Sequence, residues 1–150
     1  MDQTQAIRNK IRQLFLGQKT AVLATHHDGQ PYTSLVAFQG SGDLKHIFFV
    51  TPKQTRKFVN LSADPRVSIL LTNSTNDDAD FYEAIAVTAT GRAAAIEGVR
   101  KEEALAAYLQ KHPFLADFAG SPACAMVCVT VDSYSMVEKF QNVLELHMDA

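Results

Sequence analysis

Tight turn signals divide the first third of the chain into short β-type segments, and this limits the folds open to it. Asp28-Gly29 separates residues 20–25 from residues 32–38, and Gly40-Ser41-Gly42-Asp43 precedes a third segment at 46–51. Asp-Gly between apolar runs is a strong hairpin signal, and a hairpin joins antiparallel strands. The sequence therefore predicts an antiparallel meander. A doubly wound parallel sheet would need repeated helical crossovers.

The rest of the chain supplies further strands and the helices that flank them. Strands are expected at residues 66–72, 85–95 and 124–136, with a short final strand at 143–147. Helices are expected at about 4–16 and about 99–111, with shorter ones at 55–61 and 114–118. One apolar stripe of the first helix holds Ile7, Ile11, Leu14 and Phe15. Phe114 is expected to pack in the core. These elements predict a mainly β fold with flanking helices, in which an antiparallel barrel has helices packed at its ends and forms one domain over residues 1–150.

The charge balance argues against several classes of partner. The 14 Lys and Arg residues face 16 Asp and Glu residues, a net charge of −2, which disfavours general affinity for nucleic acid or anionic membranes. No apolar run approaches the roughly 18 residues that span a bilayer. The polar N-terminus lacks the apolar core of a signal peptide. We therefore expect a cytoplasmic protein that binds neither nucleic acid nor membrane.

The sequence lacks the spacing of a disulfide or a metal site. Cys124 and Cys128 lie on one predicted strand. Their Cα atoms are then roughly 13 Å apart, beyond the roughly 7 Å that a disulfide allows. The five histidines lack ligand spacing, and the acidic residues Asp77, Asp78 and Asp80 lack the glycine turn of a calcium loop. We expect two buried free thiols and no metal.

One turn has the composition of a phosphate site. In Thr51-Pro52-Lys53-Gln54-Thr55-Arg56-Lys57 a strand ends at Thr51 and a helix begins near Thr55. The first N–H groups of a helix have no intrahelical acceptor, and the helix dipole is positive there. Two hydroxyls and two cations at such a point suit a phosphate dianion. The alternative is a solvated basic turn in which Thr55 only caps the helix.

Four segments in order resemble the pyridoxamine 5′-phosphate oxidase family of FMN-binding split barrels. They are Asp28-Gly29-Gln30-Pro31-Tyr32-Thr33-Ser34-Leu35-Val36, Ile47-Phe48-Phe49-Val50-Thr51 with Thr55-Arg56-Lys57, Asp64-Pro65-Arg66-Val67-Ser68-Ile69-Leu70-Leu71, and Val87-Thr88-Ala89-Thr90-Gly91-Arg92-Ala93. The resemblance covers about residues 20 to 95. It implies a six-stranded split barrel and a homodimer with FMN at the interface.

The resemblance also assigns roles to residues. It implies that Thr51, Thr55, Arg56 and Lys57 bind the FMN phosphate and ribityl chain. It implies that the backbone around Ser34 to Phe38 lies along the flavin ring, and that Asn73 reaches toward the partner's flavin. The residues expected to bind cofactor are Ser34, Leu35, Val36, Ala37, Val50, Thr51, Thr55, Arg56, Lys57 and Asn73. No catalytic side chain is assigned.

The chain departs from the family at substrate and cofactor positions. Ser34 stands where the family has Arg, Gln39 where it has Lys, and Ala86 where it has a flavin-contacting Gln. Glu145-Leu146-His147 stands near the family's Arg-x-His motif. These differences indicate a divergent member that is not an authentic pyridoxamine 5′-phosphate oxidase. The expected function is an FMN-dependent oxidoreductase acting on a small organic substrate. The alternatives are a non-catalytic flavin-binding or electron-transfer protein, or a split barrel that uses F420 or haem.

Overall fold

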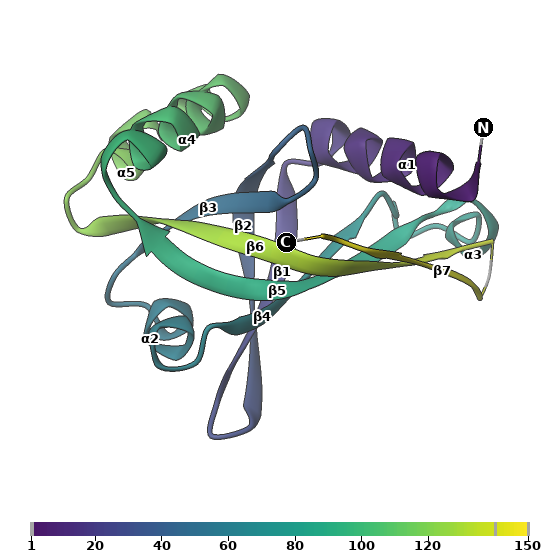
Figure 1. Ribbon diagram of the computed structural model, residues 1–150, viewed down its shortest axis with the longest axis horizontal. Coiled ribbons are helices and arrows are strands. Elements are labelled where there is room, and N and C mark those ends of the chain that lie inside the picture. Colours follow the sequence, from purple (N-terminus) through teal and green to yellow (C-terminus); the bar gives the residue numbers. More distant parts are fainter. Residues whose placement is uncertain (1, 140, 150) are drawn as a thin grey trace.

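The computed structural model describes residues 2–139 and 141–149, and its centre is a closed antiparallel barrel (Figure 1). The barrel strands are β1 (Thr20–His27), β2 (Gln30–Gly40), β3 (His46–Pro52), β4 (Arg66–Thr72), β5 (Ala86–Ile96) and β6 (Cys124–Glu138). They pair in the order β3-β2-β1-β4-β5-β6, and β3 also pairs with β6, which closes the ring. The expected six-stranded barrel is therefore confirmed.

A seventh strand, β7 (Asn142–His147), lies outside the barrel and pairs with the last part of β6, residues 133–138. The first part of β6 pairs instead with β3. One long strand thus closes the barrel with its first half and carries an additional strand on its second half.

The hairpin between β1 and β2 has the backbone that its sequence predicts. Asp28 and Gly29 both have positive φ, 48° and 81°. Two successive residues with positive φ form the tight turn whose twist matches that of the flanking strands. Asp-Gly tolerates this conformation, and the register it sets places His27 opposite Gln30.

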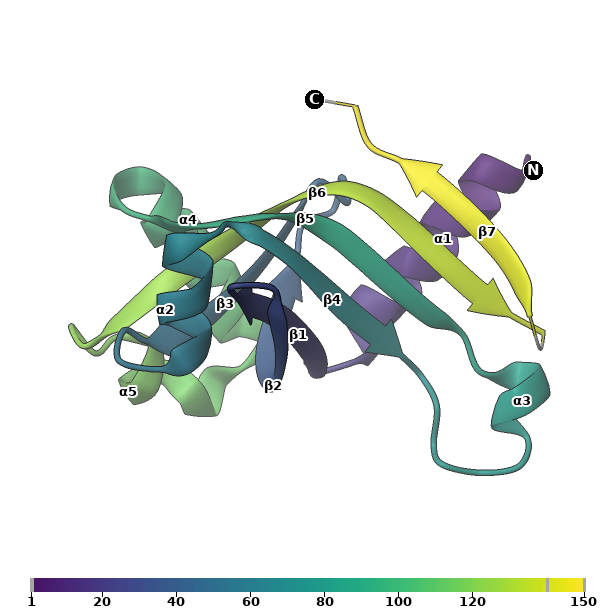
Figure 2. The same cartoon turned by 90° about the horizontal axis from the view of Figure 1, so that it is seen from below.

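Helices cover the barrel on several sides (Figures 1 and 2). They are α1 (Gln3–Gly17), α2 (Arg56–Ala63), α3 (Asp80–Glu83), α4 (Gly98–Lys111), the 3-10 turn η1 (Pro113–Leu115) and α5 (Ala116–Ala119). The apolar stripe of α1 is confirmed, because Ile7, Ile11, Leu14 and Phe15 are all buried in the barrel core. Within the described residues, no helix has the length and apolarity needed to cross a membrane.

A second, smaller core lies under α4 and α5. It joins Tyr108 of α4 to the outward side of β3 and to Cys124 and Cys128 of β6. Both cysteines are buried and free, as expected. The prediction for Phe114 was wrong. Its side chain is 74% exposed, because the short η1 turn directs this ring to solvent while Leu115 packs inward.

The barrel is split between β2 and β3. These strands share three residue pairs, the last of which joins Phe38 to Phe49. From there β2 continues with β1 alone, and β3 continues with β6. The two strands diverge, and a backbone edge of β2 faces the gap.

Gly91 is required where β5 crosses β6 at a β-bulge. The register shifts between Thr90 and Gly91, and a Cβ atom at Gly91 would lie 2.1 Å from the backbone oxygen of Thr130. We predict that Gly91→Ala lowers the free energy of unfolding by about 1–3 kcal/mol, because the clash is with backbone and not with a flexible side chain. Chemical denaturation measures the effect. Gly17→Ala is the matched control, since nothing lies within 4 Å of its added methyl group. Equal stability of the two variants would contradict the prediction.

Candidate functional site

A cleft of about 260 Å³ opens where β2 and β3 diverge. Its lining includes five of the residues expected to bind cofactor, namely Leu35, Val36, Ala37, Val50 and Lys57. Pro52 of β3 and the α4–α5 segment complete the wall, the latter with Tyr108, Leu115 and Phe118. The cleft therefore lies between a strand edge and a helical wall, and Lys57 lies on its lining.

The turn from β3 into α2 brings two hydroxyls together at the helix N-terminus. The Oγ1 atoms of Thr51 and Thr55 lie 2.9 Å apart, and Thr51 is fully buried. Thr55 caps α2 by accepting a hydrogen bond of 3.4 Å from the backbone N–H of Phe58. The backbone N–H groups of Arg56 and Lys57 belong to the first turn of α2, where the helix has no earlier carbonyl to accept from them. They therefore point outward at the positive end of the helix dipole.

The two cations of this turn lie in different surroundings. The Arg56 guanidinium carbon lies 5.4 Å from the centre of the Tyr32 ring, at the start of β2. Such a contact orients the guanidinium without neutralising it. Lys57 instead lines the cleft. The turn therefore carries positive charge both at the β2 hairpin and at the cleft.

Ser34 carries a buried hydroxyl that has no hydrogen-bond partner within the described part of the chain. It lies opposite Leu23 in the β1–β2 register, and Leu23 is a core residue. Because side chains alternate along a strand, Ser34 shares its face with Tyr32 and Val36, whereas Leu35 and Ala37 share the other face. Ser34 is not on the cleft lining itself, and its Oγ is left unpaired, an arrangement that costs free energy.

Helix α4 holds β2 at the point where the split begins. The Tyr108 hydroxyl donates to the Ala37 carbonyl oxygen at 3.4 Å, and His112 Nε2 lies 2.8 Å from the Phe38 carbonyl oxygen. A carbonyl oxygen only accepts, so in this contact Nε2 is the ring nitrogen that carries a hydrogen and donates it. Burial raises the pKa of Tyr108 to about 12, which keeps its hydroxyl a donor at neutral pH. These roles were not predicted from the sequence, although Tyr108 in the last turn of α4 and its C-cap His112 are only four residues apart.

Asn73 is not brought to the cleft. It follows the end of β4, and its side-chain oxygen accepts a hydrogen bond of 2.8 Å from the Ile85 N–H. Figure 2 shows α3, next to this connection, at the opposite end of the molecule from α2.

Two of the positions at which the chain differs from the expected family pattern also lie outside the cleft. Gln39 lines a separate cavity beside α4, and the Glu145 carboxylate lies 3.6 Å from His147 Nε2 on β7.

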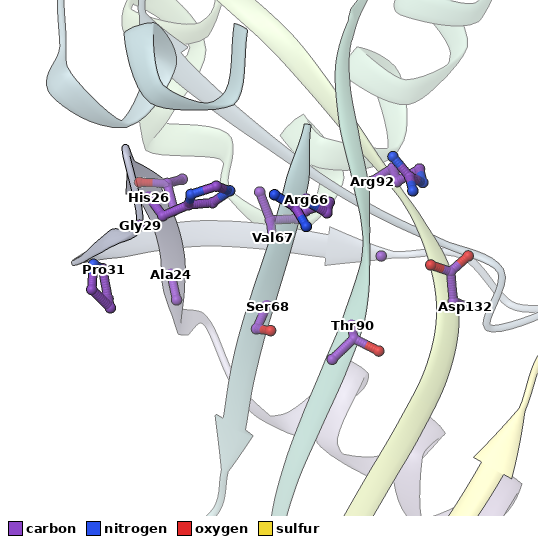
Figure 3. A pocket seen from close by; sticks show the side chains of 12 residues that line it. Ala24, His26, Gly29, Pro31, Arg66, Val67, Ser68, Thr90, Arg92 and Asp132 are labelled. Carbon is purple, nitrogen blue, oxygen red and sulfur yellow. The ribbon is translucent and has the colours of Figure 1, made fainter. Parts of the chain in front are cut away.

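A larger cavity, of about 640 Å³, lies against the outer face of β1, β4, β5 and β6 (Figure 3). Arg66 and Arg92 lie opposite each other on β4 and β5. Arg66 donates twice to Asp64, at 3.0 and 2.7 Å, and His26 lies 3.1 Å from the same carboxylate. The hydrogen bonds from Arg66 hold the pKa of Asp64 well below its usual range. Asp132 is on the lining beside Arg92, so the charges of this cavity are largely balanced.

Comparison with solved structures relates the fold to several proteins. A heme binding protein from Mycobacterium smegmatis has a TM-score of 0.83 at 19% identity; the match covers 93% of this chain and 57% of that one. HutZ, a heme storage protein from Vibrio cholerae, has a TM-score of 0.71 at 17% identity, with 82% and 88% covered. An FAD-binding protein from Mesorhizobium loti has a TM-score of 0.66 at 17% identity, with 85% and 90% covered. At these identities the matches establish the fold alone. The chain spans little more than half of the M. smegmatis protein.

Comparison with curated protein sequences gives no match. Comparison with family models gives a match. The model described as pyridoxamine 5′-phosphate oxidase matches residues 7–138, from the first turns of α1 to the last residue of β6. The match includes every strand of the barrel and the whole β3–α2 turn. The chain therefore belongs to the pyridoxamine 5′-phosphate oxidase family of split barrels.

Proposed function

We propose that the protein binds FMN in the cleft between β2 and β3 and acts as an oxidoreductase on a small organic substrate. The observation that carries the proposal is the β3–α2 turn. Two hydroxyls 2.9 Å apart lie there at a helix N-terminus, with Lys57 on the cleft lining and Arg56 against Tyr32 at the β2 hairpin. A phosphate group needs this combination of donors and positive charge. Family membership supports a flavin as the group that carries the phosphate.

The unpaired hydroxyl of Ser34 supports the fit. A buried hydroxyl without a partner is disfavoured unless a ligand atom completes its hydrogen bonding. Ser34 lies on the strand face of Tyr32, whose ring contacts Arg56. A phosphate oxygen at the N-terminus of α2 would give Ser34 an acceptor. In this way a short hydroxyl would take part in a site where other family members use a long Arg side chain.

The residues would divide the work of binding. The first N–H groups of α2 would donate to the phosphate, and Arg56 and Lys57 would balance its charge. The Thr51 and Thr55 hydroxyls, which bond to each other and to the Pro52 carbonyl oxygen, would hold the turn in shape around it. The exposed edge of β2 at Leu35 to Ala37 would pair with polar atoms of the ring, with Val50 beneath. When bound, FMN supplies two-electron chemistry, and the protein binds, orients and shields it.

Haem fits the cleft less well. Among the described residues, no histidine lines the cleft, so a haem there would lack an axial imidazole from this wall. The absorbance of the purified protein separates the cofactors. Flavin bands that co-elute with the protein support the proposal, whereas a Soret band or the spectrum of F420 would contradict it.

Removing both cations of the turn tests the phosphate assignment. We predict that Arg56→Ala combined with Lys57→Ala weakens FMN binding by at least about tenfold, because each charge-assisted hydrogen bond contributes about 1.5–3 kcal/mol. Quenching of flavin fluorescence measures the affinity. Lys19→Ala with Lys45→Ala removes the same charge from exposed positions outside the cleft and should leave the affinity unchanged. A folded double variant at positions 56 and 57 with normal FMN affinity would refute the assignment.

Ser34→Ala should affect the free and the loaded protein in opposite directions. Without FMN, the variant should be as stable as the original protein or more stable, since it removes an unpaired buried hydroxyl. FMN affinity should fall by roughly tenfold, the loss of one hydrogen bond to a charged group. Thermal unfolding and FMN titration give the two readouts, with Ser62→Ala, at an exposed serine in the last turn of α2, as control. A Ser34→Ala protein that is less stable without FMN but binds it normally would show that the hydroxyl serves the fold.

A homodimer would complete the site. The cleft of about 260 Å³ is smaller than the roughly 300–1,000 Å³ of typical ligand pockets. Apolar side chains are exposed both beside the cleft and on the outer faces of β4 and β6, where Leu35, Leu70 and Val137 are 68%, 40% and 39% exposed. Pairing of these surfaces would bring the Asn73 end of one protomer to the cleft of its partner.

Charges placed on the outer sheet face should prevent this association. We predict that Leu70→Glu combined with Val137→Glu gives a species of half the mass in light scattering and lowers FMN affinity, because carboxylates cannot be buried there without partners. Val99→Glu is the control, an equally apolar position that is 68% exposed on α4. A mass that does not change in the double variant would exclude this surface as the interface.

A further inference from the structure

One side of helix α2 carries three polar residues that contact the β1–β2 hairpin. They are Arg56, Asn60 and Asp64, the last of which is the C-cap of the helix. A spacing of four residues places successive members of this set on the same side of a helix. Each of the three side chains contacts a different residue of the hairpin, and we refer to them together as the polar stripe of α2.

The central contact of the polar stripe is buried within the chain. Asn60 donates from Nδ2 to the Thr25 hydroxyl at 3.1 Å, and Thr25 donates in turn to the Tyr32 carbonyl oxygen at 3.5 Å. Asn60 and Thr25 are each only 3% exposed. A directed series of hydrogen bonds therefore runs from the helix to β1 and from β1 to β2.

The two outer contacts of the stripe lie at the same part of the hairpin. Tyr32 is directly opposite Thr25 in the β1–β2 register, and the Arg56 guanidinium carbon lies 5.4 Å from the centre of its ring. His26 follows Thr25 on β1, and its Nε2 lies 3.1 Å from the Asp64 carboxylate. The stripe thus meets the hairpin at three neighbouring residues.

These polar contacts fix a position that apolar packing alone would leave variable. Helix α2 has eight residues, and its apolar contacts with the core come from Phe58 and Leu61. Apolar burial is non-directional. Replacing both members of a buried hydrogen-bonded pair by apolar groups of the same shape is nearly neutral for stability. What the buried pair adds is therefore a single rotation and height of the helix, because its donor and acceptor meet only there.

We propose that Asn60, through its bond to Thr25, and Tyr32, through its contact with Arg56, are positioning residues for the phosphate of FMN. They set the direction of the first N–H groups of α2 and of the Arg56 guanidinium. This inference rests on the proposed function, because it concerns how the phosphate site at the N-terminus of α2 is held in place. Neither Asn60 nor Thr25 lines the cleft, so both act through the helix. Binding groups need such supporting hydrogen bonds to stay within about 0.5 Å of their working geometry.

Riboflavin, which is FMN without its phosphate, separates positioning of the phosphate site from general stability. The combined variant Thr25→Val and Asn60→Leu removes both polar side-chain groups, so neither is left unpaired. We expect it to bind FMN about tenfold more weakly and riboflavin with unchanged affinity, since only the phosphate depends on the direction of α2. Quenching of flavin fluorescence measures both affinities. A folded variant that keeps the original ratio of the two affinities would overturn the inference while the flavin function stands.

Two further variants are matched controls for this ratio. Thr25→Ser keeps the hydroxyl and should keep the ratio. Tyr134→Phe removes a buried hydrogen bond of 2.6 Å to the Leu44 carbonyl oxygen, which involves neither α2 nor the β1–β2 hairpin, and it should keep the ratio as well. A lower ratio in Tyr134→Phe would show that any loosening of the barrel weakens FMN binding, and this would overturn the inference.

Tyr32→Leu tests the inference without changing the buried pair. Tyr32 is 38% exposed, so this variant provides a result even where the core does not tolerate the double substitution. FMN binding should weaken by about threefold, the loss of one exposed cation–π contact, and riboflavin binding should not change. Unchanged FMN affinity would overturn the inference. Equal affinities of the unmodified protein for FMN and riboflavin would instead refute the phosphate site of the proposed function, and the inference with it.

Discussion

The divergence of β2 from β3 after the Phe38–Phe49 pair is the constraint on which the rest of the site depends. A strand that leaves its neighbour exposes a row of backbone groups, which in most proteins invites unwanted pairing. Here helix α4 lies against the departing strand, and Tyr108 and His112 each bind a β2 carbonyl. The open edge is therefore held in one position, and its remaining backbone groups face a cleft of defined shape.

The site combines two chemically distinct regions. The β3–α2 turn offers hydroxyls, N–H groups and cations, whereas the α4–α5 wall offers aliphatic and aromatic surface. Lys57 lies at the boundary between them. A ligand with a charged tail and a flat aromatic head matches this division. The larger cavity on the outer sheet has cations too, but there Asp64 binds Arg66 and His26, and Asp132 shares the lining with Arg92.

Much of the fold could be read from local sequence because its determinants are local. Asp28 and Gly29 set the first hairpin by their backbone preference, and the stripe of α1 follows from helical spacing. The composition of the β3–α2 turn is local as well. Other features depend on contacts between residues that are far apart in the sequence. The bond from Tyr108 to Ala37 spans 71 residues, and the burial of the Ser34 hydroxyl depends on neighbouring elements. Phe114 was misplaced because a short turn has no periodicity that distinguishes its inner side.

The long strand β6 also determines when the site can form during synthesis. Thr51 pairs with Ala125 of β6, and the Lys53 N–H donates to the Ala123 carbonyl at 2.9 Å. The turn that precedes α2 is therefore anchored by residues made about seventy positions later. Contacts of such long range form late in folding. A nascent chain that has completed α2 still lacks this anchor, so the β3–α2 turn reaches its final geometry only after β6 has closed the barrel.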